Sequence, residues 1–327
     1  MQRDRRLALG AVPVMLLQAC GGGGGSPAPA PLNDGAVNGS GTNVLPPTTT
    51  SPSPSPAPAP SPTPAPAPGP APSVVYGDLR AASLGVGASL NGALPFPANN
   101  AWNTDISAAP VDPNSANLIA SIGANTALHP DFGSGTYNGF PVGIPYTVVS
   151  GSQSRVPIYY TLYGSESDPG PFPIPVTAPV EGDPNGGGDR HVLVIDRDNN
   201  RLYEIGFAKA YSDRWEAGAG AVFHTDSNTV RPTGQAGWTS ADAAGLPIFP
   251  GLVRYEEAAR GPGGIRHALR FTVAVSRNAY VPPATHAASS NGSVNLPPMG
   301  MRVRLKASYA IPAVSYTHLT LPTKRIV

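Results

Sequence analysis

Proline alternates with alanine, serine or threonine almost without interruption over residues 51–73. Proline has no backbone N–H and a fixed φ, so alternate prolines prevent both helix and sheet and favour polyproline II. Residues 21–50 are rich in Gly, Pro, Ser, Thr and Ala and almost uncharged, and such segments cannot bury a core. We therefore expect residues 20–73 to be a disordered tether. Residues 74–313, about 240 in number, then suffice for one globular domain.

The first twenty residues predict a lipoprotein signal peptide. A positively charged start (1–6) precedes an apolar run (7–17) that is shorter than the roughly 20 residues of a membrane span. The sequence Leu17-Gln18-Ala19-Cys20 resembles the lipobox of bacterial lipoproteins, although Gln18 is unusual there. The resemblance implies removal of residues 1–19 and lipidation of Cys20, which would hold the chain on a membrane. Cys20 is the single cysteine, so no intrachain disulfide is possible.

The residue after Cys20 is Gly21 rather than Asp. By resemblance to Gram-negative lipoproteins, this implies sorting to the outer membrane, facing the periplasm or the cell surface. At the other end of the chain, residues 314–323 match the translation of a common sequencing adapter. We expect residues 314–327 to be an artefact, and the natural sequence to diverge near Val314.

The pattern of the domain is mainly β. A helix is expected over 112–123, where Asp112 and Pro113 suit its start and Gly123 its end, and a second short one over 252–259. Apolar alternation and β-rich composition predict the strands. The expected strands cover 146–149, 156–163, 191–195, 202–205, 265–275 and 299–309. Such a set favours a β-sandwich or jelly roll with a few short helices.

His191 and Glu204 lie on the two strands of an expected hairpin and could meet across it. An imidazole beside a carboxylate suits proton transfer near neutral pH. The alternative is a strand-end histidine that is bonded to backbone. The turn between the strands contains Asp196, Asp198 and Asn200, but Gly and Glu are missing from the later positions of a calcium loop. A polar turn is the better interpretation.

Trp238 and Asp242 fall in one turn, which Thr239 or Ser240 can cap and Gly245 can end. An aromatic ring that stacks on a sugar and an acid that exchanges a proton are typical of a polysaccharide site. The alternative is a capped turn whose Trp238 belongs to the core.

His267 lies on the apolar face of an expected strand, between Arg266 and Arg270, and Tyr280 follows in a loop. A base with a nearby arginine that neutralises a uronate carboxylate suits a polysaccharide lyase. The alternative for His267 is a core histidine. His129, His224 and His286 show no zinc-type spacing.

Three blocks resemble a family of uncharacterised secreted bacterial proteins: DRHVLVIDRDNNRLYE (189–204), GWTSADAAGLPIFPGLVRY (237–255) and IRHALRFTV (265–273). The resemblance implies one exported domain and no mechanism. The sequence thus predicts an exported, membrane-anchored lipoprotein that acts on polysaccharide as hydrolase or lyase. A non-catalytic glycan-binding or cell-wall-binding module and a structural lipoprotein are the alternatives.

The predicted catalytic residues are His191, Glu204, Asp242, His267 and Tyr280, and the predicted substrate-binding residues are Trp238, Arg266 and Arg270. No metal or cofactor is expected. The net charge of +1 gives no reason to expect nucleic acid as a partner.

Overall fold

The computed structural model describes residues 74–126, 135–231, 237–261 and 263–309. The predicted signal peptide (1–19), the lipidated Cys20 with the tether (20–73) and the adapter-like tail (314–327) lie outside the described residues, as does His129. Regular structure in the described part is mainly β, as expected, with two short α-helices.

The strands are β1 Val75–Tyr76, β2 Gly85–Val86, β3 Ala93–Leu94, β4 Thr136–Tyr137, β5 Phe140–Pro141, β6 Tyr146–Val149, β7 Ile158–Tyr160, β8 Val192–Asp196, β9 Arg201–Gly206, β10 Lys209–Ala210, β11 Trp215–Ala217 and β12 Ala219–His224. The helices are α1 Ser115–Ile122 and α2 Tyr255–Ala258, with 3-10 turns η1 Gly164–Glu166 and η2 Phe249–Gly251.

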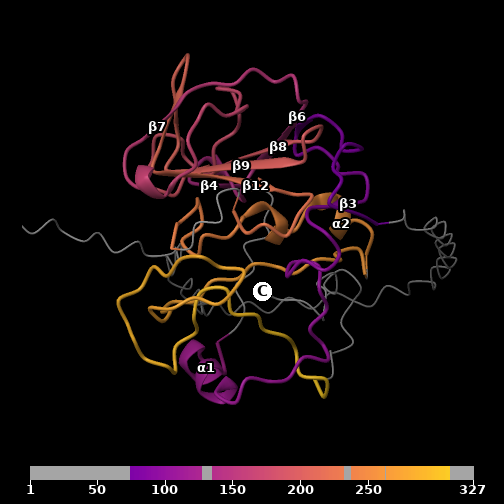
Figure 1. Ribbon diagram of the computed structural model, residues 1–327, viewed down its shortest axis with the longest axis vertical. Helices are drawn as coiled ribbons and strands as arrows, with labels where there is room; N and C mark the ends of the chain where they lie inside the picture. Colours follow the sequence, from indigo (N-terminus) through magenta and orange to yellow (C-terminus); the bar gives the residue numbers. More distant parts are fainter. Residues whose placement is uncertain (1–73, 127–134, 232–236, 262, 310–327) are drawn as a thin grey trace, which may run out of the picture. The chain divides into compact units, whose positions relative to one another are not determined.

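The largest sheet has five strands in the order β12-β9-β8-β6-β2 (Figure 1). β8 and β9 form the predicted hairpin, with Val192 opposite Ile205 and Asp196 opposite Arg201. β6 runs parallel to β8, and β12 is antiparallel to β9. A second sheet has the order β10-β11-β7, and two further sheets have two strands each. Among the described residues, all four sheets are open at their edges.

Apolar clusters cover both faces of the five-stranded sheet. On β8, Leu193 and Ile195 join one cluster, while Val192 and Val194 join the other. A strand that is buried on both sides reads as a continuous apolar run, which explains the sequence Val-Leu-Val-Ile. The second cluster also holds Trp215 of the three-stranded sheet.

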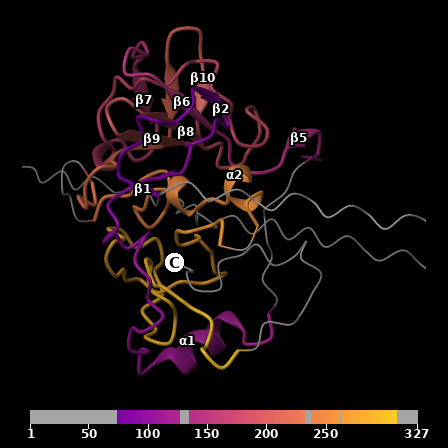
Figure 2. The same ribbon diagram turned by 90° about the vertical axis from the view of Figure 1, so that its right-hand side faces the viewer.

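The predicted helix at 112–123 is confirmed as α1. The helix begins at Ser115, and its N-cap is Asn114 rather than Asp112. Asp112 accepts the Asn114 N–H at 2.7 Å. Gly123 ends it at φ +106°. Only Leu118 of the helix is buried, and both views show α1 far from β7 (Figures 1 and 2). The predicted helix at 252–259 is confirmed as the shorter α2.

The strands predicted over 265–275 and 299–309 are wrong. Burial alternates as expected at the start of the first segment, where Arg266 is exposed between buried Ile265 and His267. Its backbone N–H groups, however, bond to separate loops: Ala268 to the Trp102 carbonyl and Arg270 to the Gly251 carbonyl. An extended segment with changing partners forms no ladder. The second segment makes an isolated bridge at Met299.

Candidate functional site

His191 and Glu181 form a close pair just before β8. The His191 Nδ1 atom lies 2.5 Å from Glu181 Oε2, and the His191 Nε2 atom lies 3.1 Å from the Ala241 carbonyl oxygen. Both partners are acceptors, so only the protonated imidazole donates to both. Burial by itself lowers the pKa of His191, but the hydrogen bond and charge of Glu181 outweigh it and the pKa is raised.

Glu204 points into the core from β9 and is fully buried. Its Oε1 atom accepts the Phe249 N–H at 2.8 Å, and its Oε2 atom accepts the Ile248 N–H at 2.8 Å. Burial raises the pKa of Glu204 to about 7, against the opposing effect of these two bonds. The carboxyl group therefore holds the backbone at the start of η2 and has no exposed surface.

Arg270 and Asp242 are paired, with Arg270 Nη2 at 2.5 Å from Asp242 Oδ2. Burial raises the pKa of Glu181, but the hydrogen bonds and charge of His191, with a smaller contribution from Arg270, lower that pKa overall. The charge of Arg270 also acts, as a minor contribution, against the raised pKa values of Glu204 and His191. We call these five residues the Arg270 cluster: Glu181, His191, Glu204, Asp242 and Arg270. The structure thus brings together four of the eight residues that the sequence predicted for catalysis and substrate binding.

The Arg270 cluster reaches the surface at one side. The side chains of Glu181 and Arg270 are 25% and 24% exposed, whereas those of Asp242 and His191 are 15% and 9% exposed. A substrate could meet Arg270 and Glu181 directly, but the second nitrogen of His191 is covered by Ala241.

His267 lies in a separate buried network. Its Nε2 atom is 3.1 Å from Glu257 Oε2, and its Nδ1 atom is 2.7 Å from the Ala268 carbonyl. Glu257 also pairs with the buried Arg254. Burial raises the pKa of Glu257, but Arg254 and His267 outweigh it and lower that pKa. His267 therefore has the geometry of a satisfied core histidine, not of a base in a cleft.

Trp238 is half-buried, and its ring centroid lies 5.5 Å from the guanidinium carbon of Arg231. Arg231 is fully buried and donates to Asp168 at 3.0 Å and to the Thr239 carbonyl. The turn after Trp238 is closed by Ser240 Oγ, which accepts the Asp242 N–H at 3.0 Å. The capped turn is present, and no ring contact or ion pair among the described residues joins Trp238 to Asp242.

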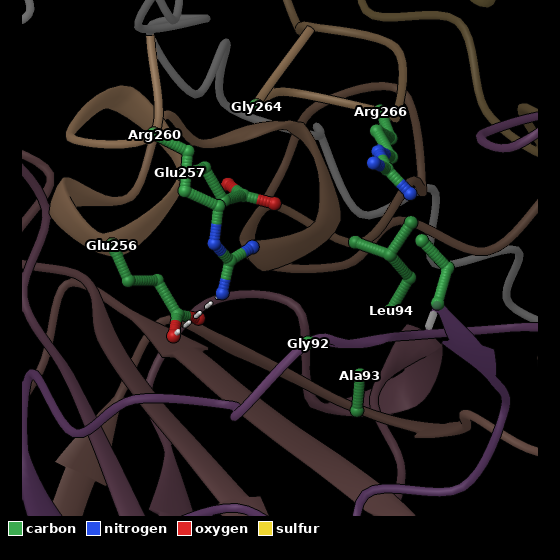
Figure 3. Close-up of a pocket in the computed structure, with 9 residues that line it drawn as sticks. Gly92, Ala93, Leu94, Glu256, Glu257, Arg260, Gly264 and Arg266 are labelled. Atoms are coloured by element: carbon green, nitrogen blue, oxygen red, sulfur yellow. Dashed lines mark ion pairs between the residues drawn. The ribbon is translucent and has the colours of Figure 1, made fainter. Parts of the chain in front are cut away.

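Tyr280 and Arg266 lie on two other segments of the chain. Tyr280 is 39% exposed and its backbone forms a bridge with Met299. Arg266 is exposed, donates to the Gly263 carbonyl at 3.3 Å, and lines a separate pocket beside α2 (Figure 3).

Glu181 is the member of the cluster that sequence reasoning missed. It lies in a Pro/Gly-rich loop with no periodicity, and nothing in the local sequence points to His191. Its charge in a domain with few charged residues was the only available signal. Within the described ranges, no three His, Cys, Asp or Glu side chains are arranged to hold a metal ion. Nor does any helix in these ranges have the length and apolarity of a membrane span.

Fold and site together define a mainly β domain with a half-buried ionic cluster next to its largest sheet. No family model, curated protein or solved structure matches the chain.

Proposed function

We propose that the chain is an exported lipoprotein of the cell envelope, anchored through lipid on Cys20, whose β domain cleaves polysaccharide. One observation supports the enzymatic part: the His191–Glu181 pair and the Arg270–Asp242 pair meet at one turn. His191 Nε2 lies 3.1 Å from the carbonyl oxygen of Ala241, the residue just before Asp242. Interacting groups with shifted pKa values in a half-buried setting are typical of acid–base sites. The anchor and the outer-membrane location rest on the sequence, as does kinship with a family of secreted bacterial proteins.

Of the two reactions, the geometry favours lyase over hydrolase. Hydrolysis needs a carboxylic acid that can reach the bond, and Glu204, whose pKa is suitably raised, has no exposed surface. A lyase needs a base and a cation beside the uronate carboxylate. Glu181 orients His191, and once the imidazolium has lost its Nε2 proton to solvent, the neutral ring takes the proton next to that carboxylate. Arg270 stabilises the charge that develops. The carbon–oxygen bond to the leaving sugar then breaks, a carbon–carbon double bond forms, and the leaving oxygen takes the proton back from His191.

This mechanism requires two exchanges of partner. The substrate carboxylate replaces Asp242 on Arg270, and the Nε2 atom of His191 gives up the Ala241 carbonyl. Asp242 and Ala241 are adjacent in the chain, so one displacement of their turn achieves both.

The test is a screen of the purified chain against a polysaccharide panel, with unsaturated products and reducing ends as readouts. We expect unsaturated products from a uronate-containing polymer and their loss in His191→Gln and Arg270→Lys. Arg80→Lys is the matched control, because Arg80 forms an exposed ion pair with Asp78. Reducing ends without unsaturation would instead support a hydrolase. Lipidation is tested by Cys20→Ser, which we expect to move the chain from the membrane to the soluble fraction.

A non-catalytic glycan-binding module is the second candidate, and the three-stranded sheet favours it. Tyr159 on β7 is 56% exposed. It lies opposite Glu216 on β11, which in turn lies opposite Lys209 on β10. An exposed ring flanked by polar side chains suits sugar stacking. Binding without turnover, lost in Tyr159→Ala and kept in His191→Gln, would select this function.

We also propose that the five-stranded and three-stranded sheets are the layers of a β-sandwich or jelly roll. The apolar cluster that contains Val192, Val194 and Trp215, from both sheets, supports this arrangement.

A further inference from the structure

The residue after Asp242 in its turn holds a second histidine. The Nδ1 atom of His286 lies 2.7 Å from the Ala243 carbonyl oxygen, and its Nε2 atom lies 4.0 Å from Glu166 Oε2. The second distance is too long for a hydrogen bond, so the two side chains face each other across a gap. Glu166 ends η1, which is far from His286 in the sequence.

The bond to Ala243 fixes the role of each ring nitrogen of His286. A carbonyl oxygen only accepts, so Nδ1 carries the proton and, in the neutral ring, Nε2 is an acceptor. The His286 N–H also donates to the Ala244 carbonyl at 3.2 Å, which ties its backbone to the same turn. The Ala241 carbonyl covers Nε2 of His191, whereas Nε2 of His286 has no hydrogen bond to any described residue. The His286 side chain is 25% exposed, so solvent reaches this acceptor.

Glu166 is anchored but keeps unused acceptor capacity. Its Oε2 atom accepts the Thr239 N–H at 3.2 Å, and its backbone carbonyl accepts from Nη2 of Arg231 at 3.4 Å. Arg231 is fully buried and also donates to the Thr239 carbonyl, so it holds both segments together. The Glu166 side chain is 35% exposed, and its Oε1 atom has no hydrogen-bond partner within the described ranges.

The charges around Glu166 leave a negative excess. Arg231 pairs with Asp168 at 3.0 Å and also responds to the charge of Glu166. One guanidinium offsets one of these two carboxylates, and the neutral ring of His286 adds no positive charge. In the part of the chain that the structure describes, no lysine or other arginine pairs with Glu166. A cation is therefore the favoured ligand.

Two acceptors at this separation suit a group with at least two N–H donors. We propose that Glu166 and His286 bind a primary ammonium group, as carried by an amino sugar or by a diamino acid in a peptide. A nitrogen about 2.8 Å from both acceptor atoms forms an angle of roughly 90° with them, near the angle of about 109° between N–H bonds. A hydroxyl group has one hydrogen and satisfies one acceptor. The inference goes beyond the proposed function, because it requires no turnover and no residue of the Arg270 cluster.

The experiment follows binding of glucosamine to the purified chain by NMR titration, with N-acetylglucosamine as the matched neutral sugar. We expect only glucosamine to bind, because acetylation removes the charge and leaves a single N–H. Glu166→Gln keeps an oxygen for the Thr239 N–H but loses the charge, and should weaken binding about tenfold. His286→Ala removes the neutral acceptor and should weaken binding about threefold. Asp78→Asn is the control, since its side chain is similarly exposed, at 37%, and should bind as the wild type does.

Two further probes separate the sources and the cause of binding. Lysine amide with an acetylated α-amine carries the same ammonium group on a peptide. Tighter binding of this probe than of glucosamine assigns the site to a peptide, and the reverse assigns it to a sugar. Tetramethylammonium carries the charge without N–H donors and should not bind.

Three results overturn the proposal: no binding of either amine, equal affinity of Glu166→Gln and the wild type for glucosamine, or tetramethylammonium that binds as tightly as glucosamine. None of them bears on the lyase reaction, which is measured by unsaturated products and involves other residues.

Discussion

Arg270 Nη2 lies 2.5 Å from Asp242 Oδ2, although the residues are 28 positions apart in the chain. Asp242 also accepts the Ala244 N–H at 2.8 Å through its other oxygen, so the ion pair is fixed to the turn. The ion pair joins two irregular segments, and the described chain between them holds only η2 and α2. It also places the charge of Arg270 within range of Glu181 and His191.

The His191–Glu181 pair predicts a stability maximum at mildly acidic pH. The raised pKa of His191 means that its contribution is complete below the ordinary value of 6.5 and is lost as pH rises through the folded pKa. The lowered pKa of Glu181 means that its contribution is present above 4.5 and is lost as pH falls. Thermal unfolding across pH should show this maximum in the wild type and a flatter profile in His191→Gln. His286→Gln, which leaves the pair intact, should keep the wild-type profile.

From the raised pKa of Glu204 we predict a second loss of folding stability as pH rises. Its folded pKa of about 7 exceeds its ordinary 4.5, so the folded state increasingly disfavours ionisation between these values. Glu204→Gln cannot ionise and keeps one oxygen for the two N–H groups. As pH rises from 4.5 to about 7, we expect the free energy of unfolding of this variant to increase by roughly 3 kcal/mol relative to that of the wild type. Denaturant titrations at several pH values measure the difference, and a constant difference would contradict the assignment.

We predict that truncation of Glu257 causes a large loss of folding stability. Glu257→Ala leaves the buried Arg254 without its closest carboxylate and His267 without one acceptor. Removing one partner of a buried ion pair costs about 3–5 kcal/mol. Asp213→Ala, at a side chain 72% exposed, should cost less than about 1 kcal/mol. Similar losses of unfolding free energy in the two variants, measured by urea unfolding, would contradict this prediction.

We predict that a side chain added at Gly245 clashes with its neighbours in the turn that carries Asp242. Its φ is +72°, and an added Cβ would lie 2.7 Å from the Trp238 carbonyl oxygen and against Thr285 Oγ1. Gly261 has a similar φ of +74° but open space around it. Gly261→Ala should therefore show only the backbone cost of about 1 kcal/mol, and Gly245→Ala clearly more. Matched thermal melts of the two variants decide this.

Local patterns predicted the local elements. The alternation and turn residues of 191–205 yielded the β8–β9 hairpin, and Gly123 marked the end of α1. Alternation failed over 265–275, because it reports which side chains are buried and not which backbone groups lie opposite. There Ala268 and Arg270 bond to two different loops.

The sequence by itself determined the hairpin, the two helices, the mainly β character and a set of polar residues worth testing, because each depends on neighbours in the chain. Only the tertiary structure decided which polar residues meet. His191 pairs with Glu181 from an irregular loop, Asp242 pairs with Arg270, and His267 is buried against Glu257. Such contacts depend on how distant segments pack, and hydrophobic periodicity carries no information about them.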